Sequence, residues 1–436
     1  MSITAKFGGS SLADASQIRK VADIIKADPR RRHIVLSAPG KRTSADKKIT
    51  DLLYLCHSLA SQGLGIETAF GPVRQRFAEI ASELGVGEMP GWLVEVEEKI
   101  AGGADADWIA SRGEYLNSRM IARFLGATFV DPASTIRIGP DGRLVPGETY
   151  AALAEALDGD GLFVAPGFYG SDSAGRIRCF SRGGSDITGA IVARAAGDEI
   201  YENWTDVSGM LMADPRIVDS PRPIAELTYR EQRELSYMGA TVLHDEAVFP
   251  VREAGIPINI RNTNDPSAPG TRIVTARDSS EDEIVGIAGR VGFTNVYTDK
   301  ALMNAETGYG RRMLEILENR GISYEHAPTS IDTMSVIVRD EELAGKEDLV
   351  LGDIEQRLKP DHVDITGDIA LIATVGEGMH RRIGVAARLF GALGKAGVNI
   401  LMINQGASEI NIIVGVSASD YENAVRAIYA EFVPAR

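Results

Sequence analysis

The sequence has little cysteine and little histidine. Its 436 residues include two cysteines, Cys56 and Cys179, which cannot form a disulfide framework or a four-thiolate metal site. The six histidines are scattered without the spacing of metal ligands. We therefore expect no protein-held transition metal, and the low cysteine content fits a reducing compartment.

Long apolar runs are also missing. The longest apolar stretches, such as 410–416, are far shorter than the roughly 20 residues that span a bilayer. The start of the chain lacks the apolar core of a signal peptide. These absences predict a cytoplasmic protein with no membrane partner.

The chain has no excess of basic residues. Its formal net charge is -15, so a nucleic acid would be repelled unless a local basic patch overrode the overall field. Basic residues gather in short, interrupted runs, at 29–32 and around Lys41, Arg42, Lys47 and Lys48. We interpret the first run as solvated surface and predict no nucleic-acid partner.

The composition is that of a globular protein, with 44% hydrophobic and 25% charged residues, and the length suggests two or three domains. Strand-like and helix-like segments alternate up to about residue 275. This alternation predicts an α/β sandwich with a mostly parallel central sheet. The expected strands are 33–37, 127–131, 162–166, 198–204 and 257–261, and the expected helices include 116–125 and 187–196.

The last third of the chain contains an internal repeat. Gly321 aligns with Gly397, an offset of 76, and at this offset Leu314 matches Phe390 without gaps. Both copies read helix, glycine, strand, turn, strand. With the expected strands 284–290, 293–298 and 369–376 they form two ferredoxin-like βαββαβ units, whose sheet edges favour pairing with another copy. The predicted domains are 1–276, 284–360 and 366–436.

Two glycine turns precede helices. The first spells KFGGSS at 6–11, where glycines let the backbone approach an anion and Lys6 adds a positive charge. The second spells FSRGGSD at 180–186 and adds Arg182, a planar donor, and the anionic Asp186. Each turn taken alone could be purely structural, and the pair favours a phosphate site.

A third motif runs from Trp204 to Arg216, just after an expected strand. Loops at the carboxyl ends of parallel strands bind ligands in open α/β sheets. Thr205 and Asp206 suit a ribose or purine edge and Arg216 a phosphate, whereas the alternative is an ordinary turn.

The segment 40–44, GKRTS, is similar to part of a P-loop. Val35 stands where a P-loop has its first glycine, and Arg42 follows Lys41 where a serine or threonine is required. We do not interpret this segment as a phosphate loop.

Together these segments resemble the aspartate kinases of the amino-acid kinase family. The repeat resembles the paired ACT domains with which such enzymes bind amino-acid effectors. The second ACT unit is often inserted within the first, which would change the linear boundaries. The matching motifs are KFGGSS at 6–11, RGE at 112–114, SRGGSDITGA at 181–190, WTDVSG with ADPR at 204–216, ELSYMGATVLHDEA at 234–247 and NTNDPSAPGT at 262–271.

The resemblance implies ATP-dependent phosphorylation of the L-aspartate side chain to 4-phospho-L-aspartate, the first step toward lysine, threonine and methionine. It implies that Lys6 stabilises the transferred γ-phosphoryl and that Asp186 holds this lysine and the metal-nucleotide. Mg²⁺ would sit chiefly on the phosphates of ATP. The implied nucleotide contacts are Gly8, Gly9, Ser10, Gly183, Ser185, Thr205, Asp206 and Arg216, and the implied acceptor contacts are Ser37, Thr50, Glu114 and Arg182.

The resemblance also implies feedback control. An end-product amino acid, lysine or threonine, would favour one arrangement of a homodimer or of a dimer of dimers joined through ACT domains. The implied effector contacts are Gly308, Tyr309, Gly310, Glu325, Thr329, Ser330, Asn404, Gln405 and Asn411.

Two positions depart from the family pattern. Thr241 stands where many members have lysine, and Leu211 where a tyrosine is common, so nucleotide contacts there stay open. Because the chain ends at Arg436, we expect no fused dehydrogenase.

Two alternative functions also remain. One is a kinase for another acidic amino acid such as glutamate, since Glu114 and Arg182 suit any α-amino acid with a side-chain carboxylate. The other is a non-catalytic amino-acid sensor, against which the intact Lys6 and Asp186 argue.

Overall fold

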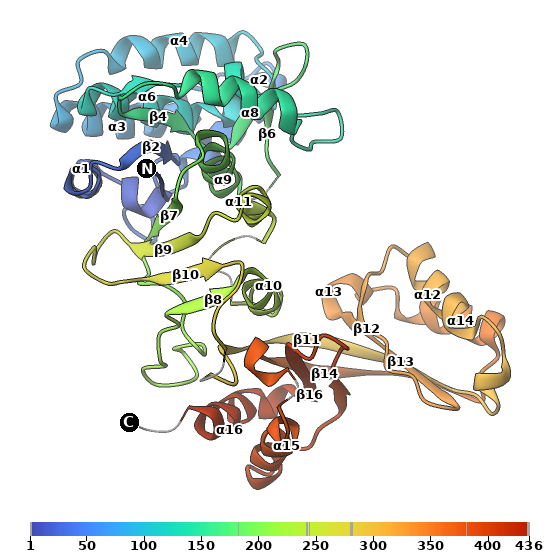
Figure 1. The fold of residues 1–436 in the computed structure, drawn as a ribbon. Helices are drawn as coiled ribbons and strands as arrows, with labels where there is room; N and C mark the ends of the chain where they lie inside the picture. The colour runs from blue at the N-terminus through green and yellow to red at the C-terminus, as the bar shows by residue number, and fades with distance from the viewer. Residues whose placement is uncertain are drawn as a thin grey trace. The chain divides into compact units, whose positions relative to one another are not determined.

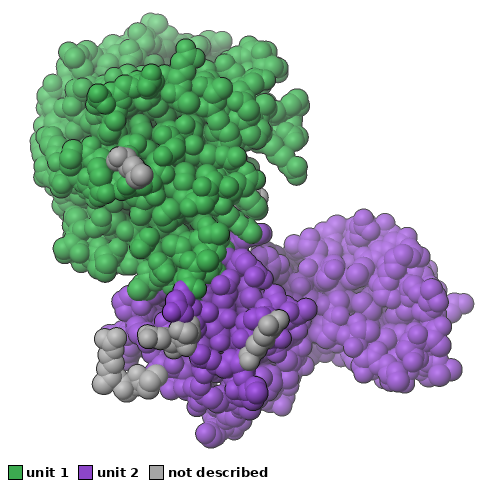
Figure 2. Space-filling view, viewed as in Figure 1, with its two compact units in different colours: residues 1–210, 225–229, 242–277 green, residues 211–224, 230–241, 278–436 purple. Residues whose placement is uncertain are grey.

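The computed structural model describes residues 2–181, 183–240, 243, 245–279, 282–380 and 382–433. The chain forms two compact units, drawn in different colours in Figure 2. The first contains residues 1–210, 225–229 and 242–277, and the second contains residues 211–224, 230–241 and 278–436. The segment between 211 and 277 therefore contributes to both units.

The first unit is built on a mostly parallel sheet of eight strands among the described residues, in the order β3-β4-β2-β1-β7-β9-β10-β8 (Figure 1). Its pairs are parallel except that β10 runs antiparallel to β9. The predicted α/β sandwich is confirmed. The strands are β1 Ile3–Phe7, β2 Arg31–Leu36, β3 Thr128–Phe129, β4 Phe163–Pro166, β7 Ile200–Thr205, β8 Glu226–Thr228, β9 Ile258–Asn262 and β10 Thr271–Val274.

Side-chain alternation along the strands gives this sheet a core on each face. On β2, Ile34 and Leu36 join the cluster that contains helix α1 (Ala15–Ala27) and helix α6 (Arg112–Leu125). Val35 points to the opposite face, where it joins Ile191 of helix α9 (Gly184–Ala196). Full burial of each such side chain contributes roughly 2 kcal/mol, so the register of β2 is strongly fixed.

Helices fill the chain between β2 and β3, where the sequence predicted only the helix 116–125, which lies within α6. These are α2 (Ile49–Ser61), α3 (Glu67–Leu84), α4 (Met89–Ala101) and α5 (Ala106–Ala110), followed by α6. Helix α3 buries Phe70, Val73 and Phe77 along one side and ends at Gly85, whose φ of 73° suits a left-handed C-cap.

The rest of the first unit completes the second face. Helices α8 (Pro146–Ala156) and α11 (Phe249–Ala254) pack on α9. A short hairpin joins β5 (Tyr169–Ser171) to β6 (Ile177–Cys179), and a single turn, α7 (Pro132–Thr135), packs on β5.

The second unit is built on an antiparallel sheet of six strands among the described residues, in the order β12-β13-β11-β14-β16-β15. The expected strands 284–290 and 293–298 form one strand, β11, whose register with β14 shifts near Gly292. The φ of 93° at Gly292 accommodates this bulge, so the chain bends without ending the strand. The strands are β11 Gly286–Asp299, β12 Tyr324–His326, β13 Thr333–Arg339, β14 His362–Val375, β15 Met402–Asn404 and β16 Asn411–Ser417.

The repeat is visible in the helices of this unit. Helix α12 (Tyr309–Asn319) and helix α15 (Val385–Lys395) have bounds that differ by 76 residues at both ends, the offset found in the sequence. Strand β13 pairs with residues 293–299 of β11, whereas β16 pairs with residues 369–375 of β14. Residues 286–291, which the sequence analysis assigned to the first copy at 284–360, pair instead with residues 370–375 of β14, in the half of the sheet around β16.

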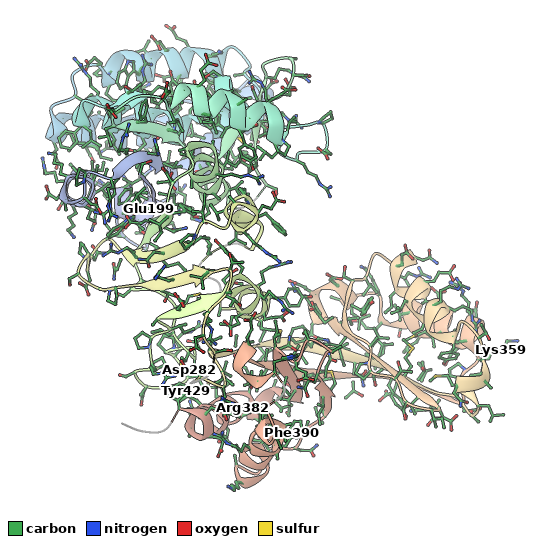
Figure 3. The ribbon with its side chains drawn as sticks, in the orientation of Figure 1. Glu199, Asp282, Lys359, Arg382, Phe390 and Tyr429 are labelled. Carbon is green, nitrogen blue, oxygen red and sulfur yellow. The ribbon has the colours of Figure 1, made fainter. Side chains whose placement is uncertain are left out.

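Other helices cover this second sheet. Helices α13 (Asp340–Leu343) and α14 (Glu347–Leu358) belong to the first copy, and α16 (Tyr421–Phe432) to the second. The backbone N–H of Arg222 donates to the hydroxyl of Tyr429 on α16 at 2.8 Å, and its guanidinium pairs with Asp282 at 3.1 Å; Tyr429 and Asp282 are labelled in Figure 3. These contacts fix the segment 211–224 on the second unit.

Within the described part of the chain, none of the helices combines the length and apolar character needed to cross a membrane.

Candidate active site

The centre of the site is an ion pair between Lys6 and Asp186. Lys6 lies on β1 directly beside Asn203 of β7, and its ammonium is 2.5 Å from the Asp186 carboxylate at the start of α9. The amide of Asn203 donates to the same carboxylate at 2.9 Å, and its oxygen lies 3.5 Å from the Lys6 ammonium. Because Lys6 is only 8% exposed, its charge acts in a poorly screened environment.

Helix α9 begins at this point because of its glycines. Gly183 caps the helix with a φ of 58°, and a Cβ on Gly184 would lie 2.7 Å from the Phe168 ring. The first N–H groups of the helix, including that of Ser185, lie in the turn that carries Asp186, where a helix favours anions. Lys6 thus faces the positive end of a helix with one carboxylate between them.

The glycine loop after β1 is held by its own backbone. The N–H of Gly8, predicted to bind phosphate, donates instead to the carbonyl of Trp204 at 3.0 Å because it continues the ladder between β1 and β7. Gly9 and Ser10 then open a short 3-10 helix, η1 (Gly9–Leu12), before its first internal donor, Ser11. These two N–H groups suit an anion beside Lys6.

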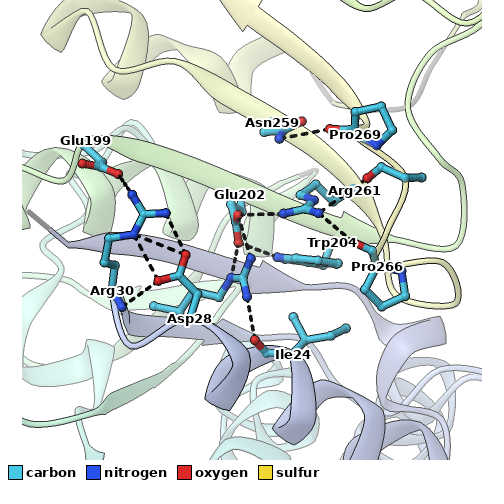
Figure 4. Close-up of polar contacts among 12 residues, drawn as sticks. Ile24, Asp28, Arg30, Glu199, Glu202, Trp204, Asn259, Arg261, Pro266 and Pro269 are labelled. Atoms are coloured by element: carbon cyan, nitrogen blue, oxygen red, sulfur yellow. Dashed lines mark hydrogen bonds and ion pairs between the residues drawn. The ribbon is translucent and has the colours of Figure 1, made fainter.

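On the opposite face of the sheet, buried charges fix the strands that carry the site (Figure 4). Glu202 of β7 accepts from Arg31 at 2.6 Å, from the Trp204 indole at 2.9 Å and from Arg261 at 3.3 Å. Trp204 in turn stacks on Phe7, the residue after Lys6. This network links β2, β7 and β9, with β1 held between β2 and β7.

The predicted acceptor residues converge on the same edge of the sheet. Ser37 follows β2, and Thr50 and Glu114 lie in the first turns of α2 and α6. A Cβ on Gly113 would lie 2.9 Å from the side chain of Ala38, so α6 packs closely on the residue after Ser37. The amide of Asn117, one turn along α6, donates to the Ser37 carbonyl at 2.7 Å.

Glu114 is a buried carboxyl group with one oxygen free to accept a hydrogen bond. Burial raises its pKa to about 7, against which hydrogen bonds from the backbone of Ala38 and from its own backbone act. Its Oε2, together with the buried Asn117 Oδ1 and Ser118 Oγ, lacks a hydrogen-bond partner. Three unsatisfied buried polar atoms on one stretch of helix are costly, and two of them accept only, which suits a cationic ligand group.

Comparisons with known proteins agree with this geometry. The sequence model of the amino acid kinase family matches residues 1–262, and a model of the ACT domain matches residues 372–432. Aspartokinase 3 of Bacillus subtilis is 42% identical to the chain, over 98% of both proteins. This chain belongs to the aspartokinases of the amino acid kinase family.

Solved aspartokinases have the same fold. The crystal structure of Clostridium acetobutylicum aspartate kinase, described as an allosteric enzyme, superposes with a TM-score of 0.92 at 46% identity, over 99% of both chains. Aspartokinase III of E. coli in complex with lysine and aspartate, the T-state, gives 0.76 at 26% identity, also over 99% of both chains.

The nucleotide residues predicted from the aspartokinase motifs are spread over both units. Thr205 ends β7 and its hydroxyl donates to Asp206, which is exposed. Arg216 belongs to the second unit, where its guanidinium pairs with Asp214 at 2.6 Å. Arg182 and Thr241 lie outside the described residues. The place of the nucleotide base therefore stays a prediction.

Two residues of the site were missed by the sequence analysis. Asn203 bridges Lys6 and Asp186, but only the pairing of β1 with β7 shows this. Phe168 adopts a left-handed φ of 81° between β4 and α9, and its N–H donates to Thr188. A non-glycine residue held in this conformation costs of order 1 kcal/mol or more, and such residues gather at functional sites. No signal in the local sequence marks either one.

The predicted effector residues all lie in the second unit. Gly308, Tyr309 and Gly310 begin α12, whereas Thr329, Ser330 and Gln405 lie in loops beside strand ends. Three others contact neighbours that the sequence analysis did not anticipate. Glu325 accepts from Arg339 at 2.7 Å and from Tyr237, Asn404 lies 2.8 Å from His326, and Asn411 donates to Glu234 at 2.6 Å. Glu234 and Tyr237 belong to helix α10 (Tyr229–Tyr237).

Proposed function

We propose that this aspartokinase transfers the γ-phosphoryl group of ATP to the side-chain carboxylate of L-aspartate and makes 4-phospho-L-aspartate. The observation that carries the proposal is the buried Lys6–Asp186 pair at the carboxyl edge of the sheet, together with the buried Glu114 carboxyl group, whose Oε2 lacks a hydrogen-bond partner. The Lys6–Asp186 pair suits a transferred phosphoryl group, and Glu114 suits the ammonium of an amino acid.

Lys6 stabilises the negative charge that spreads over the phosphoryl oxygens during transfer. Phosphoryl transfer needs positioning and electrostatic stabilisation more than covalent chemistry, so a fixed, poorly hydrated cation is effective. Asp186 and Asn203 keep the ammonium in place. Gly9, Ser10, Gly183 and Ser185 supply backbone donors to the phosphates, Gly8 leaves room for them, and Thr205, Asp206 and Arg216 complete the nucleotide contacts.

Mg²⁺ enters as part of the nucleotide. Among the described residues, no group of three or more histidine, cysteine, aspartate or glutamate side chains could hold a metal ion by itself. Mg²⁺ keeps several waters and needs one or two protein carboxylates besides phosphate oxygens. Asp186 fits that role, and the bound ion would neutralise phosphate charge.

The acceptor binds on the α6 side of the site. Glu114 in its ionised form holds the α-ammonium, Arg182 holds a carboxylate, and Ser37 and Thr50 supply hydroxyl groups. E. coli aspartokinase III has been crystallised with aspartate and ADP, and it matches this chain at 27% identity over 99% of both chains with a TM-score of 0.73. That relative supports the pairing of nucleotide and amino acid.

Regulation belongs to the second unit. We infer two interleaved ACT units, because residues 286–291 pair with the half of the sheet formed by the second copy. A homodimer or dimer of dimers would form through these units and bind an end-product amino acid, lysine or threonine. The enzyme would act in the cytoplasm on the first step toward lysine, threonine and methionine.

Release of ADP tests the proposal directly. The purified protein is supplied with MgATP and, in separate assays, with aspartate, glutamate or neither, each with and without lysine, threonine or methionine. We expect turnover with aspartate and inhibition by at least one end product. Equal rates with glutamate would favour the broader kinase, and inactivity with every acceptor would favour the sensor.

A further inference from the structure

The segment 40–46, which the sequence presented as an incomplete P-loop, lies against the glycine loop of the active site. The N–H of Gly40 donates to the carbonyl of Gly9 at 2.8 Å. A Cβ on Gly40 would lie 2.5 Å from the Gly9 carbonyl carbon and 2.7 Å from the Ser10 nitrogen. The two backbones are therefore in direct contact, and movement of Gly40 would displace Gly9 and Ser10.

A single buried guanidinium holds this segment from its other side. Arg76 of α3 is 6% exposed; its Nη1 donates to the Gly40 carbonyl at 2.9 Å and its Nη2 to the Asp46 carboxylate at 2.7 Å. Asp46 also accepts from the backbone N–H of Arg42 at 2.8 Å and from the Arg42 side chain at 3.2 Å. Arg76 thus fixes both ends of the segment to α3.

Beyond Gly40, close packing does not hold the segment in place. A cavity of about 340 Å³ lies among α2, α3 and residues 42–47, with Ile49, Leu52 and Pro72 in its lining. Arg76 Nε is buried and lacks a hydrogen-bond partner. Because the cavity leaves residues 42–47 without a tightly packed support, the hydrogen bonds of Arg76 hold Gly40 in its close contact with Gly9 and Ser10.

We propose that Arg76 is a positioning residue for phosphoryl transfer, which acts through Gly40 to set the place of Gly9 and Ser10 beside Lys6. The proposal rests on the proposed function, since it assigns Gly9 and Ser10 to the phosphates. Arg76 touches neither the reacting groups nor Lys6 in this arrangement. Misplacement of a reacting group by about 1 Å can reduce a rate about 100-fold.

The test compares two arginines on the same helix. Arg76→Met removes the hydrogen bonds of Arg76 to Gly40 and Asp46 but leaves that between Arg42 and Glu79, and Arg76→Lys restores a single cationic donor. Arg74→Met is the matched control, because Arg74 lies two residues earlier on α3, is half exposed and pairs with Glu97 away from the segment. Asp46→Asn keeps the contact between Arg76 and Gly40 and removes one charge. It therefore replaces Arg76→Met as the test variant if Arg76→Met does not fold.

We expect Arg76→Met to lower kcat 10- to 100-fold while the KM values for ATP and aspartate change less than about threefold, since alignment rather than binding is lost. Arg76→Lys should recover part of kcat, Asp46→Asn should lose about threefold to tenfold, and Arg74→Met should stay within about twofold of the parent. Thermal unfolding of each variant corrects for the folded fraction. A folded Arg76→Met protein with the kcat of Arg74→Met would overturn the proposal.

Hydrogen exchange gives a readout that does not depend on the reaction. Peptides that cover residues 3–14 and 36–50 should exchange faster in Arg76→Met than in Arg74→Met, because Gly40 and Gly9 lose their support. Unchanged exchange in both peptides would contradict the positioning role even if kcat fell. An inactive parent protein would overturn the proposed function alone, and exchange would still decide whether Arg76 fixes the loop.

Discussion

The active-site charges of the first unit are more buried than the peripheral ion pairs of the second. In the first unit, Lys6, Asp186 and Glu202 are nearly buried, and each is held by several partners on neighbouring strands or on α9. In the second unit, pairs such as Arg388 with Glu283 are partly exposed and lie at the periphery. Buried charges are costly unless their partners are fixed, so the site in the first unit is electrostatically rigid, whereas partly exposed pairs such as Arg388 with Glu283 can exchange partners cheaply.

The contrast has a functional counterpart. A phosphoryl-transfer site must be arranged before the substrate arrives, because reorganisation during the reaction would add to the barrier. A regulatory site must instead have two arrangements of similar free energy, since an effector shifts an equilibrium only by its differential affinity. Variants in the two units should therefore fail in different ways.

The largest effect is expected for Lys6→Ala, which should lower kcat about a thousandfold or more because the developing phosphoryl charge loses its cation. ADP release measures the loss, and calorimetric titration with lysine or threonine should show effector binding at the parent level. Loss of effector binding together with turnover would contradict the assignment of catalysis and effector binding to separate units.

Lys300→Ala is the matched control for this variant. Lys300 also lies 2.5 Å from a carboxylate, that of Glu306, but it belongs to the second unit and is more exposed than Lys6. We expect its removal to change basal kcat by no more than about twofold. Near-normal, aspartate-dependent ADP production by Lys6→Ala would contradict the catalytic role.

The next effect concerns stability. Glu202→Gln leaves Arg31 buried without a full counter-charge, which should lower the free energy of unfolding by about 3 kcal/mol. The three tryptophans, Trp92, Trp108 and Trp204, all lie in the first unit, so their fluorescence during urea titration reports this loss. Glu283→Gln, at the partly exposed pair with Arg388, should cost less than about 1 kcal/mol. If Glu202→Gln and Glu283→Gln lowered the free energy of unfolding equally, the charged pairs of the two units would not differ in their contribution to stability.

The sequence predicted the first unit better than the second for a physical reason. Lys6 and Asp186 stand in glycine turns whose chemistry is local, and strand and helix periodicities placed β2, β4, β7 and α9 within a few residues. Asn203 was missed because its role depends on strand register. Of the helices between β2 and β3, only α6 was predicted, as 116–125, and a helical run does not reveal which sheet face it covers.

In the second unit the repeat predicted the two helices but not the path of the strands. The single strand β11 continues through Gly292 by a bulge, which a glycine in the sequence does not distinguish from a turn. The partners of Glu325 and Asn411 lie on α10, far away in the chain, so local pattern carries no information about them. Long-range contacts of polar side chains are the part that sequence patterns leave open.

A pH dependence should distinguish the acceptor site from its surroundings. Burial raises the pKa of Glu114 from 4.5 to about 7, so between these values the folded protein keeps a proton that the unfolded chain has lost. The stability from this group is therefore present at low pH and decreases as pH rises through about 7. The α-ammonium requires the ionised form, so KM for aspartate should fall about tenfold from pH 6 to pH 8.

Glu114→Gln should abolish the pH dependence of the KM for aspartate. Its KM should be high and nearly independent of pH, while its melting temperature above pH 7 should exceed that of the parent, because the cost of a buried, incompletely hydrogen-bonded charge has been removed. Asp107→Asn, a partly exposed carboxylate of the neighbouring α5, is the control and should keep the parent slope. A KM profile that stayed pH-dependent in Glu114→Gln would assign the ammonium contact to another group.

The smallest effect is expected in the second unit, at Tyr237. Its hydroxyl donates to Glu325, a largely buried carboxylate that also accepts from Arg339, and Glu325 is a predicted effector contact. Tyr237→Phe removes one donor, which leaves an acceptor site open for the effector ammonium. The half-inhibitory concentration of lysine or threonine should therefore fall two- to fivefold, in line with one hydrogen bond of about 1 kcal/mol, while basal kcat stays within about twofold.

Tyr297→Phe is the control. The Tyr297 hydroxyl lies 3.4 Å from Asp299, a long distance for a hydrogen bond, so its removal should leave both values unchanged. If the half-inhibitory concentration of Tyr237→Phe stayed the same or rose, Glu325 would serve the contact with α10 rather than the effector, and the second unit would be as rigidly arranged at this point as the first.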